Sequence, residues 1–110
     1  GDDGVARLVL RPAWIAGTQT FARLIERQIY WPDSHAEHFF FDRERAQIAL
    51  LDLHGCRPWR RPSRRIQQKM IGRFFGAAAC GADFPAAQVR ALLLRAGIRE
   101  PVQQIILRAL

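Results

Sequence analysis

Residues 63–79 read SRRIQQKMIGRFFGAAA, and their pattern predicts a helix with two different faces. Ser63 is a typical N-cap residue, because its hydroxyl can accept a hydrogen bond from an amide of the first turn. At about 100° per residue, the apolar side chains share one arc, which we expect in the core. They are Ile66, Met70, Ile71, Phe74, Phe75 and Ala78. The opposite side carries a cationic stripe at i, i+4 and i+8, formed by Arg65, Lys69 and Arg73.

Two glycines, Gly72 and Gly76, lie beside this cationic stripe. A glycine inside a helix costs about 1 kcal/mol of stability relative to alanine, so two of them on an exposed face need a reason. A phosphate backbone or a partner helix that approaches closely would supply one. The alternative is that the stripe is an ordinary solvated face and that the glycines permit tight helix packing. We favour the close approach, because the positive charge continues into the segment before the helix.

The predicted helix belongs to a segment without acidic residues, which runs from Leu53 to Ala82. Seven cations in this segment account for the whole formal net charge of +7, since the remaining ten basic residues equal the ten acidic ones in number. They are Arg57, Arg60, Arg61, Arg64, Arg65, Lys69 and Arg73. A concentrated field of one sign attracts polyanions such as nucleic acids. Sixteen of the seventeen basic residues are Arg, whose planar fork suits phosphate and guanine, although a GC-rich coding sequence raises the Arg content equally well.

Residues 56–65 are expected to form a basic linker rich in Arg and Pro, with Trp59 among them. It is similar to the arginine arms that some DNA-binding domains lay into a narrow minor groove. If six phosphates were neutralised, the affinity would fall with salt at a log–log slope of about −5. Trp59 would either stack on a base of a single strand or anchor the linker to the core.

Two further helices are predicted after the basic one. The first covers residues 85–96 and is stopped by Gly97, and the second begins at Glu100 with Pro101 at the permitted first position. Residues 63–110 would thus form a three-helix unit in the order that helix-turn-helix modules share. The candidate base contacts of its last helix are Arg99, Gln103, Gln104 and Arg108. Gln103 and Gln104 occur where this motif often has a buried aliphatic residue, so the pattern predicts phosphate contacts better than sequence readout.

The N-terminal half, residues 1–55, gives a less certain pattern. Alternating residues predict a strand over residues 5–11, closed by Pro12 and Gly17, and helical spacing predicts a helix over 19–30. Ser34 and Glu37 have the form of a capping box, which would open a helix that ends near Gly55. Two strands about a charged turn at residues 42–45 are the alternative. We prefer the helix because both of its ends carry capping residues.

The size and composition predict one domain that spans residues 1–110. Hydrophobic residues make up 49% and charged residues 25%, which is ordinary globular composition. The expected class is mainly α, or α+β with a short N-terminal strand or hairpin. No apolar run approaches the roughly 20 residues that span a bilayer, and the acidic N-terminus does not have the features of a signal peptide. With only Cys56 and Cys80, no disulfide framework is implied, so we expect a cytoplasmic protein without a membrane partner.

A metal site and a catalytic thiol were weighed as alternatives. His35, His38, His54 and Cys56 are the right types of ligand for tetrahedral zinc, but they lack the repeated Cys-x-x-Cys pairs of strong zinc signatures. His54 beside Cys56 would suit a thiol nucleophile, yet neither an orienting acid nor an oxyanion-hole motif can be identified. We therefore expect no metal, no cofactor and no enzymatic activity.

The leading functional hypothesis is a small regulatory domain, of the kind found in bacterial or phage regulators, that binds DNA through its basic arm and helix. In that case it would be associated with the nucleoid. The alternative is an interaction module, such as an adaptor, an antiactivator or an assembly subunit, that docks its basic face on an acidic protein surface. Residues 102–110 are too apolar for a solvated tail, so a homodimer through the C-terminal helix is one way to cover them. RNA binding ranks third, because no RRM or KH signature occurs.

Overall fold

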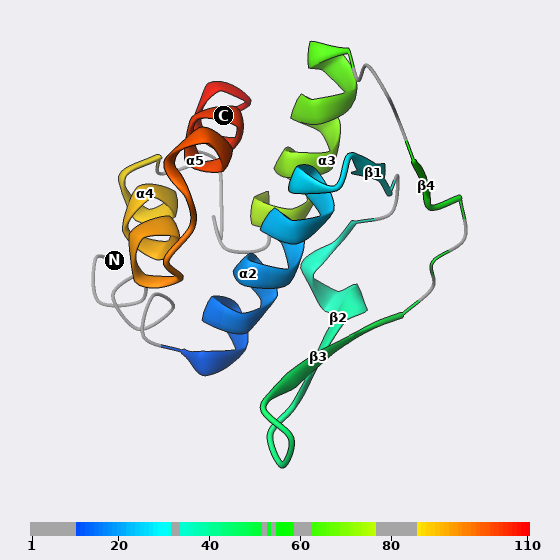
Figure 1. The fold of residues 1–110 in the computed structure, drawn as a ribbon, viewed down its shortest axis with the longest axis vertical. Coiled ribbons are helices and arrows are strands. Elements are labelled where there is room, and N and C mark those ends of the chain that lie inside the picture. Colours follow the sequence, from blue (N-terminus) through cyan, green and yellow to red (C-terminus); the bar gives the residue numbers. More distant parts are fainter. Residues whose placement is uncertain (1–10, 32–33, 52, 54, 59–62, 77–85) are drawn as a thin grey trace.

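The computed structural model describes residues 11–31, 34–51, 53, 55–58, 63–76 and 86–110. In this part of the chain, four α-helices and two pairs of short antiparallel strands form one body (Figure 1). The helices are α2 (Pro12–Glu26), α3 (Arg64–Gly76), α4 (Ala86–Arg95) and α5 (Glu100–Arg108), and η1 (Ala36–His38) is a single 3-10 turn. The strands are β1 (Ile29–Tyr30), β2 (Phe39–Asp42), β3 (Gln47–Leu50) and β4 (Arg57–Pro58). The predicted mainly helical class with a small β component is confirmed.

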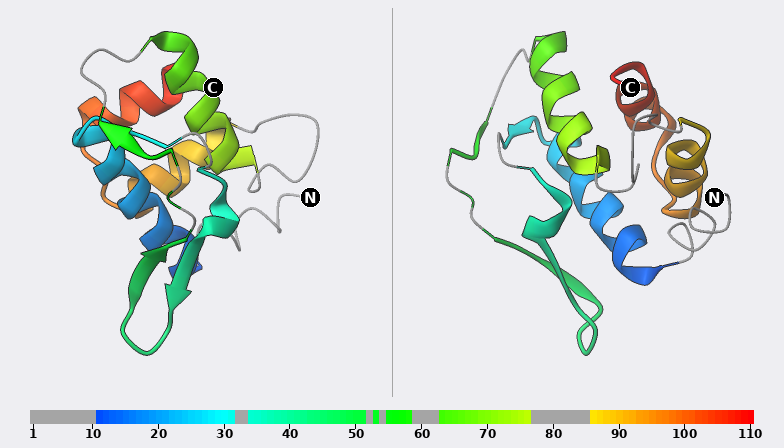
Figure 2. Two further views of the ribbon diagram at one scale, coloured as in Figure 1. Left: turned by 90° about the vertical axis from the view of Figure 1, so that its right-hand side faces the viewer. Right: turned by 180° about the vertical axis from the view of Figure 1, so that it is seen from behind.

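Helix α2 lies at the centre of the fold, with α4 and α5 on one side and the β2–β3 hairpin on the other (Figures 1 and 2). It begins at Pro12, which has no N–H to donate and a φ angle suited to the first helical position. The prediction that Pro12 and Gly17 close a strand is therefore wrong, and the predicted strand itself lies largely outside the described residues. The helix predicted over 19–30 begins earlier and ends at Glu26, where Gln28 adopts a positive φ of 56° and turns the chain into β1.

The segment predicted as one helix from Ser34 to Gly55 is instead η1 followed by a hairpin, which was the alternative. Strands β2 and β3 pair antiparallel, with Phe39 opposite Leu50 and Asp42 opposite Gln47. Two aromatic side chains in succession after Phe39 favour a strand, because aromatic residues pack well on a pleated surface. The Asp42 carboxylate accepts hydrogen bonds from the backbone N–H groups of Glu44 and Arg45, at 3.0 and 3.3 Å, and so stabilises the turn.

The capping box at Ser34 also does not form. The Ser34 hydroxyl is fully buried and donates to the carbonyl oxygen of Met70 at 2.9 Å, so it is not available to a helix start. This bond joins the loop before η1 to α3, with which η1 also packs.

The three C-terminal helices occur where the sequence predicted them. Ser63 caps α3, since its hydroxyl accepts a hydrogen bond from the N–H of Ile66 at 3.2 Å. The predicted extension of α3 to residue 79 lies outside the described residues. Helix α4 ends in a Schellman motif: Gly97 has a φ of 68°, its N–H donates to Leu94, and the N–H of Ile98 donates to Leu93.

Aromatic rings join α2, β2 and α3 in the core. Phe74 of α3 stacks on Phe21 of α2 with ring centroids 4.4 Å apart and an interplanar angle of 10°. Phe39 of β2 meets the same ring edge-on at 4.7 Å, and Phe75 meets it at 4.9 Å. Phe74 thus contacts rings from both α2 and β2. The face of α3 opposite its cationic stripe is therefore packed in the core.

Candidate polyanion-binding surface

The predicted division of α3 into two faces is present in the structure. Met70, Ile71, Phe74 and Phe75 are buried, while Arg65 and Lys69 are exposed. Arg73 is partly buried, and Ile66 is only half-buried because it lies in the first turn. The cationic stripe therefore lies on the outer side of a helix whose inner side is fixed in the core.

A hollow between the start of α3 and the end of α5 adds two cations that the stripe does not contain. It has a volume of about 400 Å³, and its lining residues are Arg64, Gln67, Ile105, Arg108 and Ala109. Arg64 belongs to the first turn of α3, where the helix dipole is positive, and Arg108 belongs to the last turn of α5. Among the described residues, the lining contains two arginine side chains and no carboxylate side chain, so the potential of this part of the hollow favours an anion. The sequence contains no signal for this pairing, because 44 positions separate the two residues.

Two residues of the segment predicted as a basic linker form a short strand. Arg57 and Pro58 form β4, which pairs with β1 so that Tyr30 is opposite Arg57. The Arg57 guanidinium lies over the Tyr30 ring, 6.0 Å from its centroid. The other predicted residues of this segment, Trp59, Arg60, Arg61 and Pro62, lie outside the described residues.

The candidate base contacts on α5 divide into one structural residue and three exposed ones. The side-chain amide of Gln103 is partly buried and donates to the carbonyl oxygen of Ile98 at 2.7 Å. Gln103 thus occupies a position that is often aliphatic, and it satisfies a carbonyl of the turn instead of facing outward. Gln104 and Arg108 are exposed, and the Arg99 side chain is 76% exposed and lies 3.9 Å from Glu26. A surface pair at that distance contributes little to stability, so Arg99 can exchange it for another partner.

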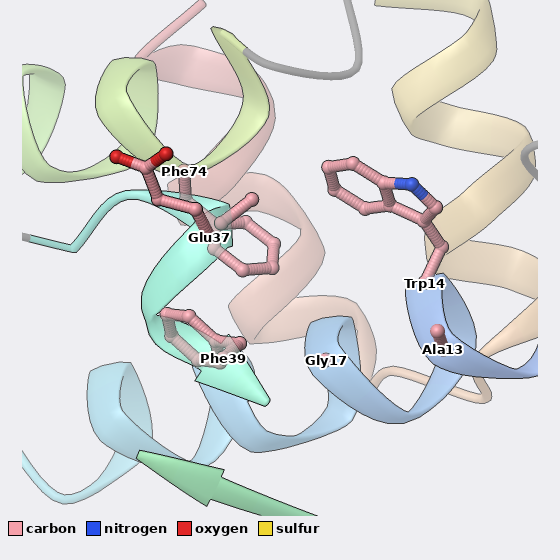
Figure 3. Close-up of a pocket in the computed structure, with 7 residues that line it drawn as sticks. Ala13, Trp14, Gly17, Glu37, Phe39 and Phe74 are labelled. Atoms are coloured by element: carbon pink, nitrogen blue, oxygen red, sulfur yellow. The ribbon is translucent and has the colours of Figure 1, made fainter. Parts of the chain in front are cut away.

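The two glycines of α3 have open space above them. Among the described residues, a Cβ at Gly72 or Gly76 would meet no atom within 4 Å, so tight packing against the described helices does not account for either glycine. They line a second hollow, of about 390 Å³, together with His35, Ala36, Glu37 and Arg73. A third hollow, of about 270 Å³, lies on the other side of Ala36 and Glu37 and is lined by aromatic rings (Figure 3). This hollow could not be expected from the sequence, because Trp14 and Phe39 come from segments whose structure was predicted incorrectly.

The zinc alternative gains no support from the described residues. The rings of His35 and His38 are 5.9 Å apart, but no group of three or more His, Cys, Asp or Glu side chains gathers there, and His54 lies outside the described part of the chain. Burial raises the pKa of the Cys56 thiol. This shift is opposite to the one that a thiolate nucleophile needs.

The apolar residues of α5 are covered by the chain itself. Val102 and Ile106 are buried in the common core, and Ile105 and Leu107 pack partly against it. Leu110, which follows the helix, is 37% exposed, so a homodimer through the C-terminal helix stays a prediction. The large apolar side chains that are most exposed near the hairpin are Phe40 (57%), Leu51 (48%) and Leu53 (48%).

Among the described helices, none is both long and apolar enough to cross a membrane. Comparison of the chain with protein-family models, with curated proteins and with solved structures gives no significant match.

Proposed function

We propose that this chain is a non-enzymatic DNA-binding domain of regulatory type that holds the phosphate backbone with α3 and α5. The observation that carries the proposal is that Arg64 and Arg108 line one hollow whose described lining residues include no carboxylate side chain. A phosphate group fits such a hollow, because each guanidinium can donate two parallel hydrogen bonds to its oxygens. Such a domain would act in the cytoplasm, in association with the nucleoid.

The arrangement of α4 and α5 supports a helix-turn-helix docking mode. Residues 96–99 form a four-residue turn around Gly97, and the residues that hold the two helices together are buried: Leu92, Ala96, Ile98, Val102 and Ile106. In that mode, α5 enters the major groove with its exposed side, while the cationic stripe of α3 and the arm before it lie along the backbone.

Sequence readout in this mode rests on two exposed residues, Arg99 and Gln104, because Arg108 is assigned to a phosphate. Arg is suited to guanine and Gln to adenine, and each good bidentate pair discriminates by about 1–3 kcal/mol. Gln103 does not take part, because its amide is engaged by the Ile98 carbonyl. We therefore expect modest sequence preference on top of a strong dependence on salt.

A fluorescence-anisotropy titration with a labelled random duplex, at salt concentrations from about 50 to 200 mM, tests the proposal. The expected result is saturable binding whose log–log slope against salt is about −5, since each phosphate contact contributes about −0.9. Absence of binding at the lowest salt concentration would overturn the proposal.

A pair of charge-matched double variants separates this surface from net charge alone. Arg64→Gln with Arg108→Gln removes the two cations of the hollow and should make the salt slope shallower by about 2. Arg43→Gln with Arg45→Gln removes two exposed cations from the hairpin turn, which takes no part in the proposed contacts, and should change the slope by much less. Equal effects of the two pairs would contradict a specific contact at Arg64 and Arg108.

A protein-interaction module is the second candidate, and the exposed apolar side chains Phe40, Leu51 and Leu53 favour it. Apolar groups that are exposed together near one hairpin often mark an interface. Light scattering of the purified chain, with and without Phe40→Ser, tests it. A concentration-dependent oligomer that the substitution dissolves would support this candidate, and a monomer that binds duplex DNA would favour the first.

A further inference from the structure

Strand β3 has an edge that pairs with no other strand among the described residues. Its one neighbour there is β2, to which it is antiparallel. The N–H of Leu51 donates to the carbonyl oxygen of His38 at 2.8 Å, which continues the same ladder by one pair. Because hydrogen-bonded pairs alternate along an antiparallel ladder, the backbone groups of Ala49 point toward β2, and those of Ile48 and Leu50 point toward the opposite edge. That edge therefore presents two N–H donors and two carbonyl acceptors to another strand.

The edge does not carry the features that usually keep strand edges from pairing. Natural edge strands are protected by charged side chains, by proline or by a bulge. Residues 46–51 read AQIALL, without a charge or a proline. Gln47, Ala49 and Leu51 are exposed. Figures 1 and 2 show that the β2–β3 hairpin extends beyond the helices, so another strand can approach it.

The distribution of charge favours a second copy of the chain as the partner. Two copies repel each other because each has a net charge of +7, and this excess lies between Arg57 and Arg73. Residues 42–45 of the hairpin turn, DRER, carry two charges of each sign, which cancel. A polyanion is attracted to the basic segment, whereas the hairpin is a place where two copies can meet without like-charge repulsion. A strand edge is also self-complementary about a two-fold axis, because each copy offers acceptors to the donors of the other.

We infer that β3 is a dimerisation edge, along which two copies pair antiparallel about a two-fold axis at Ala49. This register gives both outward-facing residues of each strand a partner, because Ile48 of one copy is opposite Leu50 of the second copy. Ala49 then faces its own copy across the axis. Leu51, which is 48% exposed, lies opposite Gln47 of the second copy, which covers part of its apolar surface. The inference rests on the second candidate function, the interaction module, whose partner it names, and it does not depend on DNA binding.

Sedimentation velocity of the whole chain over a range of concentrations tests whether this dimer forms. A single strand pair is smaller than a standard interface, so we expect a reversible dimer with a Kd that is micromolar or weaker. The dimer should not weaken when salt is raised from about 50 to 200 mM, because salt screens the repulsion between the two net charges. A chain that stays monomeric at about 500 µM would overturn the inference, since even weak interfaces associate at that concentration.

Charge substitutions at the axis test where the two copies meet. Ala49→Lys sets two ammonium groups opposite each other and should weaken the dimer at least about threefold. A mixture of the Ala49→Lys and Ala49→Glu chains should dimerise about tenfold more tightly than either chain alone, because unlike charges then face each other. Gln104→Lys and Gln104→Glu, at an exposed position of α5, are the matched controls and should dimerise as the parent chain does. A dimer that responds to Gln104 and not to Ala49 would uphold the interaction module but would overturn this inference.

A disulfide tests the register without a change in charge. In a Cys56→Ser, Cys80→Ser background, the Ala49→Cys chain should be cross-linked by the thiol oxidant diamide. The two Cα atoms at a non-hydrogen-bonded pair are about 4.5 Å apart, which is within the range of a disulfide. Leu51→Cys is the matched control on the same face and should stay uncross-linked, because the two copies of residue 51 lie about 13 Å apart along the strands. Absence of the Ala49→Cys cross-link, or an equally fast one in Leu51→Cys, would overturn the inference.

Discussion

The Ser34 hydroxyl donates a 2.9 Å hydrogen bond to the carbonyl oxygen of Met70, and both residues are buried. The bond connects two segments 36 positions apart, the loop that leads into η1 and the middle of α3. It fixes η1 beside α3, and thus fixes Ala36 and Glu37, which line both the hollow at Trp14 and the hollow at Gly72.

We predict that Ser34→Ala lowers the free energy of unfolding by about 1–2 kcal/mol, because a buried polar contact is lost between two packed segments. Urea unfolding followed by circular dichroism measures the change. Ser63→Ala removes an N-cap from exposed α3 backbone and should cost about 1 kcal/mol, but it should leave η1 in place. If Ser34→Ala changed the midpoint by less than the measurement error, the bond would contribute nothing to the fold.

Thr18 provides the opposite case, a buried hydroxyl without a hydrogen-bond partner among the described residues. We predict that Thr18→Val, which keeps the branched shape, raises the free energy of unfolding by about 1 kcal/mol, because a buried polar group without a partner costs about 1–3 kcal/mol. The same urea experiment measures it. A decrease in stability would show that the hydroxyl has a partner in the folded protein.

The helices of the C-terminal half could be predicted because their signals are local. Ser63 caps α3, Gly97 takes the left-handed conformation after α4, and Pro101 lies in the first turn of α5, each as the sequence indicated. The N-terminal half could not be predicted in the same way. Ser34 is an equally good cap by sequence, but its hydroxyl is taken by Met70, which is distant in the chain. A local signal is overridden when a tertiary partner offers a better hydrogen bond.

In the candidate site, too, local features could be predicted from the sequence and tertiary contacts could not. The cationic stripe on α3 is visible in the sequence because it repeats every four residues. The partnership of Arg64 with Arg108 depends on how α3 and α5 pack, and no spacing in the sequence encodes that. Gln103 was predicted to face a base, yet its amide is used within the turn, because the Ile98 carbonyl requires a donor.

The raised pKa of Cys56 leads to a prediction about pH. Burial favours the neutral thiol, so the folded-state pKa lies above the unfolded value of about 8.5. The contribution of Cys56 to stability should be constant below that value and should be lost as the pH rises through the folded-state pKa. In a Cys80→Ser background, Cys56 should also react with a maleimide at pH 8 more slowly than a free thiol does. A rate equal to that of the unfolded chain would contradict the burial.

Gln103 and Gln104 are adjacent but should respond differently to substitution. Gln103→Leu leaves the Ile98 carbonyl without its donor and should lower the free energy of unfolding by about 1 kcal/mol. Gln104→Ala should leave stability unchanged, because this side chain is exposed, and should lower the affinity for a preferred duplex relative to a random one. Thermal unfolding and competition binding measure the two quantities. A loss of sequence preference in Gln103→Leu alone would reverse the assigned roles.

The fold requires glycine at position 97 but not at position 72. Gly97 has a φ of 68°, so Gly97→Ala should cost about 1–2 kcal/mol, whereas Gly72→Ala in helical backbone should gain about 0.5–1 kcal/mol, because a Cβ there meets no neighbour. If a phosphate backbone approaches α3 closely, the same Gly72→Ala chain should bind duplex DNA severalfold more weakly despite its greater stability. Urea unfolding and the anisotropy titration measure both effects on one sample. A more stable protein with unchanged DNA affinity would show that DNA does not approach this part of α3.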